Sequence, residues 1–156
     1  MSESTIVNRV VVEMDIEAPR EEVFDALVDP TSVMEWWADE GDGYSCTAFE
    51  ADAREGGRWW SEHRPRNGDG PLCVLAGVYT TVERPSRLAF TWVYERFTAE
   101  YESQPATQVT IDLSETAGVT RVTLEHSGFA AGSKHAEGHR GGWRQALEGI
   151  ARLFGA

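Results

Sequence analysis

Apolar residues recur at every second position in the first patterned segment, residues 9–18 (RVVVEMDIEA). Apolar side chains occupy the even positions from Val10 to Ile16, and acidic side chains occupy odd positions from Glu13 to Glu17. A period of two places these sets on opposite faces of an extended chain. The pattern predicts a β-strand with one buried face.

A helical pattern follows, and two prolines divide it. Pro19 suits the first turn of a helix, and Asp29-Pro30 ends that helix. Thr31-Ser32 is expected to cap a second short helix over SVMEWW. The stripe that predicts the first helix consists of Val23, Phe24, Ala26 and Leu27.

The middle of the chain predicts a run of antiparallel strands, since alternating segments are separated by turn residues. A loop is expected at residues 65–71 (PRNGDGP), a second loop at Thr98–Gln104, and a tight turn at Thr116–Gly118. The predicted strands are 44–54, 58–64, 74–83, 87–97, 107–115 and 118–128.

The last segment changes to a helical period. Trp143, Leu147, Ile150 and Phe154 recur at intervals of four, three and four, which indicates an amphipathic helix. A long antiparallel sheet has one apolar face that must be covered, and this helix is the largest cover available. We therefore expect an α+β fold in which a curved antiparallel sheet wraps around a long C-terminal helix, with two short helices after the first strand.

Composition narrows the classes of partner. The 156 residues suit one domain, 1–156. The 26 acidic residues against 14 Lys and Arg give a formal charge of −12, which disfavours nucleic acid as a partner. The sequence shows neither a long apolar run nor a secretory signal pattern, so we expect no membrane contact and a cytoplasmic location. Cys46 and Cys73 have no metal-ligand spacing and are expected to be buried free thiols.

The stretch HAEGH (residues 135–139) places two histidines four apart. It is not the zinc-protease motif, in which the glutamate directly follows the first histidine. Gly138, Gly141 and Gly142 weaken a helix by about 1 kcal/mol each. We therefore expect no metal site, and interpret the stretch as a solvated lead-in to the last helix.

Several segments together resemble the activator of heat-shock-protein-ninety ATPase homologue family, part of the START-like (SRPBCC) helix-grip superfamily. The resemblance spans about Val10 to Phe154. Its segments are IEAPREEVFDALVDPTSVMEWW, FEADAREGGRW, GVYTTVERPSRLAFTW, VTRVTLEHSGF and EGHRGGW.

The resemblance implies an elongated cavity between sheet and helix that takes apolar or aromatic small molecules. It also implies that the WW pair after the short helices lies near the cavity mouth, and that the glycines of EGHRGGW bring the helix start close to the sheet. The residues expected to line the cavity are Trp37, Trp59, Tyr79, Phe90, Trp92, Tyr94, His126, Phe129, Trp143 and Leu147.

His126 shares the inward face of its strand with Val122 and Leu124, so it needs a hydrogen-bond partner. Two interpretations are open. It is either a core histidine bonded to a backbone carbonyl or to the Ser127-Gly128 turn, or a cavity histidine that orients a ligand or transfers a proton.

Three hypotheses about function follow. The first is a non-enzymatic carrier or sensor of a small hydrophobic, aromatic molecule, with Tyr94 and His126 fixing its orientation and no cofactor. The second is a polyketide cyclase or dehydratase-like enzyme with His126 as general acid–base and Tyr94 or Tyr79 as helper. The third is an interaction module that forms a homodimer or docks on a chaperone, which an exposed Trp60 or Trp37 would favour.

Overall fold

The computed structural model describes residues 8–38, 43–130 and 134–156. Seven antiparallel strands form one sheet in the order β1-β7-β6-β5-β4-β3-β2. The strands are β1 (Arg9–Ile16), β2 (Tyr44–Ala51), β3 (Arg58–Pro65), β4 (Cys73–Glu83), β5 (Arg87–Arg96), β6 (Thr107–Thr116) and β7 (Val119–Ser127). The helices are α1 (Arg20–Val28), α2 (Pro30–Trp36), α3 (Ala99–Glu102) and α4 (His135–Leu153).

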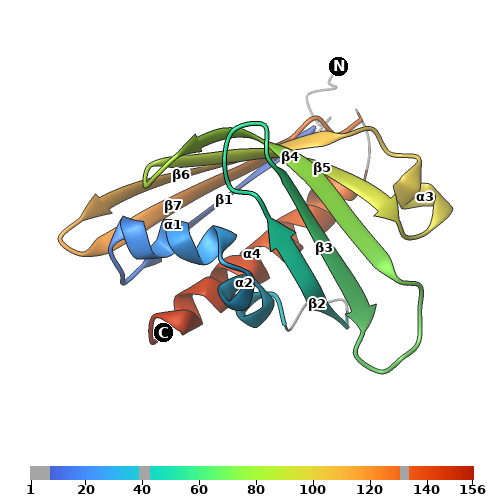
Figure 1. Cartoon of the computed structure of the whole chain (residues 1–156), viewed down its shortest axis with the longest axis horizontal. Coiled ribbons are helices and arrows are strands. Elements are labelled where there is room, and N and C mark those ends of the chain that lie inside the picture. Colours follow the sequence, from blue (N-terminus) through green and yellow to red (C-terminus); the bar gives the residue numbers. More distant parts are fainter. Residues whose placement is uncertain (1–7, 39–42, 131–133) are drawn as a thin grey trace, which may run out of the picture.

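The sheet arches over α4, as Figure 1 shows, and α1 and α2 lie beside the C-terminal half of that helix. The predicted α+β helix-grip architecture is therefore confirmed. The expected strand faces also hold, since Val10, Val12 and Ile16 are all buried. Each sheet face and helix stripe follows from the period of the hydrophobic pattern.

The curvature of the sheet has a local cause at β4. The pairing of β4 with β5 shifts register between Tyr79 and Thr81, and such irregularities bend a strand. At Gly77 a Cβ atom would collide with the carbonyl oxygen of Thr91. That same oxygen accepts a hydrogen bond of 3.1 Å from the indole N–H of Trp59. Glycine is therefore the only residue that fits at position 77, where β4, β5 and the Trp59 ring come together.

Two local predictions were wrong. Residues 98–104 were expected to be a loop, but they include the single-turn helix α3. The second helix is capped by Asp29, not by Thr31 or Ser32, because the Asp29 carboxylate accepts from the backbone N–H of Ser32 at 3.0 Å. The helix therefore begins at Pro30, where the missing N–H costs nothing.

The glycines of EGHRGGW also behave differently from the expectation. A Cβ atom at Gly138, Gly141 or Gly142 would meet nothing within 4 Å, so these residues do not press the helix against the sheet. The close approach lies further along α4, at Gly149, where a Cβ atom would collide with the backbone carbonyl of Trp36. Gly149 thus sets how closely α4 crosses α2.

The helix α4 packs chiefly against β1 and α2, at one side of the sheet. The other side, formed by β2 to β5, curves away from the N-terminal half of α4. This asymmetry leaves a hollow between sheet and helix, and that hollow contains the candidate site.

Candidate functional site

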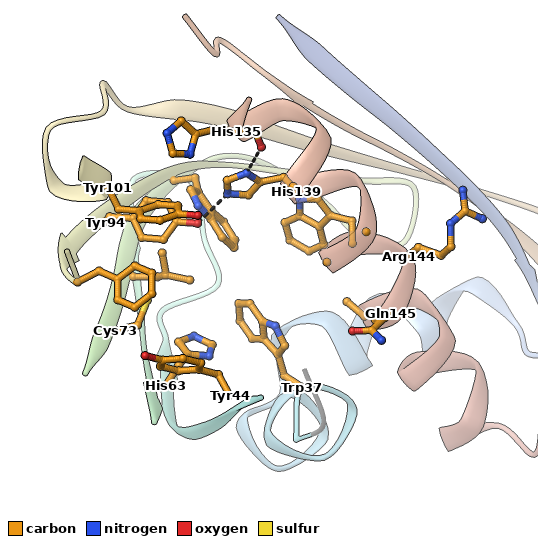
Figure 2. Close-up of a pocket in the computed structure, with 18 of the residues that line it drawn as sticks. Trp37, Tyr44, His63, Cys73, Tyr94, Tyr101, His135, His139, Arg144 and Gln145 are labelled. Atoms are coloured by element: carbon orange, nitrogen blue, oxygen red, sulfur yellow. Dashed lines mark hydrogen bonds between the residues drawn. The ribbon is translucent and has the colours of Figure 1, made fainter. Parts of the chain in front are cut away.

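A cavity of about 940 Å³ lies between α4 and the strands β2 to β5. Its walls are aromatic, and its rim carries charged side chains of α3 and α4. The lining includes Trp36, Trp37, Tyr44, His63, Leu75, Trp92, Tyr94, Phe97, Tyr101, His135, His139 and Trp143. Figure 2 shows Tyr94 and His139 on one side of the hollow and Trp37 and His63 on the opposite side.

Three of the four tryptophans that line the hollow come from different parts of the fold. Trp37 follows α2, Trp92 comes from β5, and Trp143 comes from α4. The ring centres of Trp92 and Trp143 are 5.2 Å apart, and Trp37 stacks on Trp143 at 6.5 Å. Such spacings are those of interacting aromatic pairs. The three rings therefore form a continuous apolar wall.

The indole N–H of Trp92 has no hydrogen-bond partner, which makes Trp92 Nε1 the only such buried side-chain nitrogen or oxygen among the described residues. An unsatisfied buried donor costs about 1–3 kcal/mol. The wall of the cavity therefore departs from the rule that buried polar groups are paired, a departure that native proteins concentrate at functional or strained sites.

Tyr94 and His139 form the hydrogen-bonded pair at the inner side of the cavity. The Tyr94 hydroxyl lies 2.7 Å from His139 Nε2, and His139 Nδ1 lies 2.6 Å from the carbonyl oxygen of His135. Burial lowers the pKa of His139, the backbone bond to His135 opposes that shift, and a smaller electrostatic effect of the His135 ring adds to it. His139 is consequently neutral near pH 7.

The opposite side holds a second buried pair. His63 Nε2 lies 2.8 Å from the hydroxyl of Ser61, and both residues are buried. The His63 ring meets Trp37 edge-on, with ring centres 4.5 Å apart. The cavity is therefore an apolar space with a polar pair at each side.

The rim of the cavity includes α3 and the first turn of α4. His135 Nε2 lies 3.2 Å from a carboxylate oxygen of Glu100, and the His135 ring packs against Tyr101 at 4.8 Å. Glu100 is largely exposed, so this contact contributes little to stability. It does join α3, which was predicted to be a loop, to the start of α4.

The stretch HAEGH therefore has a different role from the one expected. His135 is the first residue of α4, and His139 is a half-buried side chain of the cavity wall, not a solvated one. Gly138, Gly141 and Gly142 also line the cavity, where their missing side chains leave it open. Among the described residues, no group of three or more His, Cys, Asp or Glu side chains could hold a metal ion.

His126 lies outside this cavity, in the core between β6, β7 and α4. Its Nδ1 accepts from the indole N–H of Trp143 at 2.9 Å, and its Nε2 lies 2.7 Å from the Thr107 hydroxyl. Burial, with a smaller contribution from His139, lowers the pKa of His126 to about 2. Both ring nitrogens are bonded, so the geometry matches a core histidine, with Thr107 and Trp143 as partners in place of the expected carbonyl or turn.

The other predicted lining residues divide between cavity and core. Trp37, Trp92, Tyr94 and Trp143 line the cavity. Phe129 lies beside a separate small hollow, next to His126. The other four are buried and do not line this cavity: Trp59, Tyr79 and Phe90 border a second small hollow beneath the sheet, and Leu147 lies in the core.

Sequence reasoning missed His139, His63, Tyr44 and Tyr101. A signal for His139 was present, because the helical stripe that begins at Trp143 extends four residues back to His139 and four more to His135. The three glycines of this segment disfavour helix, so the helical stripe was not extended back from Trp143. His63 shares its strand face with Trp59 and Ser61, so period-two alternation also turned it inward.

The two cysteines, Cys46 and Cys73, are buried and form no disulfide, as expected. Within residues 8–38, 43–130 and 134–156, helices of a length and hydropathy suited to crossing a membrane are not found.

The fold and the site define a helix-grip α+β protein with an aromatic cavity between its sheet and its long helix. The chain matches the family model of the Activator of Hsp90 ATPase homolog 1-like protein over residues 17–155, and it belongs to that family. The resemblance of its sequence segments is thereby confirmed. A comparison with curated proteins finds no match.

Solved structures share the fold. Protein CV1439 from Chromobacterium violaceum has 24% identity and a TM-score of 0.81, with 96% of this chain and 98% of that chain covered. Protein MLL2253 from Mesorhizobium loti has 25% identity and a TM-score of 0.72, with 93% and 95% covered. DynU16, described as a putative protein in the dynemicin biosynthetic locus, has 23% identity and a TM-score of 0.70, with 94% of this chain and 47% of that chain covered.

Proposed function

We propose that this protein binds a small hydrophobic, aromatic molecule in the cavity between α4 and β2 to β5, as a carrier or sensor. The observation that carries the proposal is the cavity itself, about 940 Å³ in volume and walled by Trp37, Trp92 and Trp143. That volume lies in the range of small-molecule sites, which are concave, mostly apolar and furnished with few polar groups.

The helix sequence supports the same proposal. Three glycines on one side of α4 weaken the helix by about 1 kcal/mol each. They make no close packing contact that would require glycine, since a Cβ atom would have open space at each of them. Their effect is to keep the cavity wide where it reaches solvent, which a ligand site needs and a packed core does not.

Tryptophan fluorescence tests this proposal directly, because four indoles (Trp36, Trp37, Trp92 and Trp143) line the cavity and report its occupancy. We expect small aromatic compounds to quench or shift the emission saturably, and acyclic polar compounds of similar size to leave it unchanged. Untargeted mass spectrometry of small molecules released from the purified protein would identify a natural ligand. Emission that responds to no aromatic compound would contradict the proposal.

The environment of His126 argues against the enzymatic alternative, in which this residue is the general acid–base. His126 has both ring nitrogens bonded to protein groups and is fully buried, whereas a general acid–base must reach a substrate. The interaction-module alternative would be favoured by an exposed Trp37 or Trp60, but Trp37 lines the cavity and Trp60 is half-buried. The aromatic cavity therefore favours ligand binding over both.

A further inference from the structure

The indole N–H of Trp92 is a buried donor in the middle of the aromatic wall. Trp92 is only 6% exposed, and among the described residues its Nε1 is the buried side-chain atom that lacks a hydrogen-bond partner. The rings packed around it lie 5.2 to 6.2 Å away between ring centres: Trp37, Trp59, Tyr94, His126, His139 and Trp143. The donor is therefore enclosed by aromatic side chains.

The side chains around Trp92 supply no acceptor to this N–H. The two imidazoles, His126 and His139, each have both ring nitrogens bonded to other groups. The neighbouring tryptophans carry only donors of their own. Because Trp92 lines the cavity, the group that can satisfy its N–H is one that a bound molecule brings.

Such a molecule reaches the donor through the cavity. The nitrogen is covered by its neighbours, so a group on the outer surface of the protein cannot contact it. From the cavity, contact requires a wall side chain to rotate, an adjustment that is common on binding. The hydrogen bond then formed replaces an unsatisfied buried donor, which is a costly state. The N–H therefore favours a ligand that carries an acceptor over one of equal shape that does not.

The charges around Trp92 restrict the kind of acceptor. Burial lowers the pKa of both His126 and His139, so neither ring is charged near pH 7. Lys134 and Arg144, which also line the cavity, are exposed at its rim. A carboxylate beside Trp92 would be buried without a cation next to it, which is costly. A neutral carbonyl oxygen needs no such cation.

We propose that Trp92 donates its indole N–H to a neutral carbonyl oxygen of the ligand, so that the cavity selects aromatic ketones and aldehydes. The inference rests on the proposed ligand-binding function and adds to it a ligand class and a residue that determines specificity.

Three naphthalene probes test the proposal: 2-acetylnaphthalene, 2-isopropenylnaphthalene and 2-naphthoate. The first two have the same shape, but a C=CH₂ group in the second replaces the C=O group of the first. The third carries a charged acceptor. Equilibrium dialysis gives a Kd for each, and we expect 2-naphthoate to bind more weakly than 2-acetylnaphthalene.

The signal of the Trp92 N–H in a ¹H–¹⁵N NMR spectrum observes the hydrogen bond directly. It is assigned as the indole signal that disappears in Trp92→Phe. We expect 2-acetylnaphthalene to move the Trp92 proton downfield relative to its position with 2-isopropenylnaphthalene. The two probes share one ring system, so their ring-current effects are common and the difference reports the carbonyl oxygen.

Two variants assign the preference to Trp92. The ratio of the 2-isopropenylnaphthalene Kd to the 2-acetylnaphthalene Kd should fall roughly three- to ten-fold in Trp92→Phe, the effect of one neutral hydrogen bond. The matched control is Trp37→Phe, which removes an indole from the same cavity and should keep the wild-type ratio. Circular dichroism checks that each variant is folded.

The outcomes separate this inference from the proposed function. If both neutral probes bind but leave the Trp92 proton at the same position, or if the ratio is unchanged in folded Trp92→Phe, the carbonyl contact is wrong and ligand binding stands. Tighter binding of 2-naphthoate than of 2-acetylnaphthalene would contradict the preference for a neutral ligand. If none of the probes binds, the proposed function fails. Should Trp92→Phe not fold, the wild-type spectra still decide, with the Trp92 signal assigned through its contacts with neighbouring ring protons.

Discussion

His126 and His139 lie 4.9 Å apart, ring centre to ring centre, yet their environments differ. His126 is enclosed by the core, with a tryptophan N–H on one nitrogen and a threonine hydroxyl on the other. His139 lies at the cavity wall, bonded to a tyrosine that borders open space. The first histidine stabilises the join between β6, β7 and α4, and the second shapes the ligand site.

The burial of His126 predicts a loss of stability in mild acid. Its pKa falls from 6.5 to about 2 on folding. Below pH 6.5, His126 therefore binds a proton in the unfolded chain but not in the folded chain. Unfolding is then favoured as the pH falls. Between pH 7.5 and 5, His126 alone should reduce the free energy of unfolding by about 2 kcal/mol.

Urea unfolding of the wild type and of His126→Gln at the two pH values checks this expectation. Glutamine can accept from Trp143 and donate to Thr107, but it does not titrate. The other titrating groups are common to both proteins, so the difference between the two pH dependences isolates His126. Equal pH dependences in wild type and variant would show that His126 is not buried as described.

At the residue scale, strand alternation was enough to predict that His126 and the even-numbered residues of β1 point inward. It could not identify the partners of His126, because Thr107 and Trp143 come from other elements. His139 was missed for a different reason. Helix propensity argued against a helix through three glycines, and the tertiary environment overrode it.

At the scale of elements, two glycines of α4 differ in what surrounds them. A Cβ atom at Gly142 would meet nothing within 4 Å, whereas at Gly149 it would collide with the Trp36 carbonyl. Gly142→Ala should therefore raise the free energy of unfolding by about 0.5–1 kcal/mol, since alanine favours helix. Gly149→Ala should lower it, because α2 and α4 would have to separate.

Chemical denaturation of these two variants provides a matched comparison within one helix. The substitution is identical, but Gly142 is exposed whereas Gly149 is buried against α2. If both alanine variants were stabilised, the close crossing of α2 and α4 at Gly149 would be incorrect. If both were destabilised, the open space beside Gly142 would be incorrect.

The cap of α2 gives a second prediction at this scale. The Asp29 carboxylate accepts from both the backbone N–H and the hydroxyl of Ser32, each at 3.0 Å. Asp29→Ala should cost about 1 kcal/mol of unfolding free energy, and Asp29→Asn should retain most of the stability because asparagine also caps helices. Thermal unfolding of both variants measures the difference. An alanine variant as stable as the asparagine one would exclude the cap.

The elements themselves could largely be predicted from sequence, because hydrophobic period and turn residues specify them locally. The exceptions have local causes. A single-turn helix such as α3 has too few residues to show a helical period, so residues 98–104 were expected to be a loop. At the start of α2, Asp29 was interpreted as a helix breaker although its carboxylate is the cap.

At the scale of the whole molecule, the cavity exists because α4 is not centred under the sheet. The helix packs on β1 and α2, and the curved half of the sheet from β2 to β5 stands clear of its N-terminal half. Trp59, Tyr79 and Phe90, which the resemblance placed along the cavity, do point inward and are buried. Strand alternation predicts which side chains point inward. It does not predict whether an inward side chain packs in the core or borders the cavity, because this depends on the position of α4.

The most direct test of the central claim fills this hollow from the helix side and measures binding. Gly138→Phe with Gly142→Phe adds two rings one turn apart on the face that lines the cavity, and Gly138→Ala with Gly142→Ala is the matched control. Equilibrium dialysis with naphthalene should show saturable binding to the wild type and the alanine control, and binding weakened by roughly ten-fold or more in the folded phenylalanine variant. Naphthalene binding that is unchanged by the two phenylalanines, or absent from the wild type, would contradict the account.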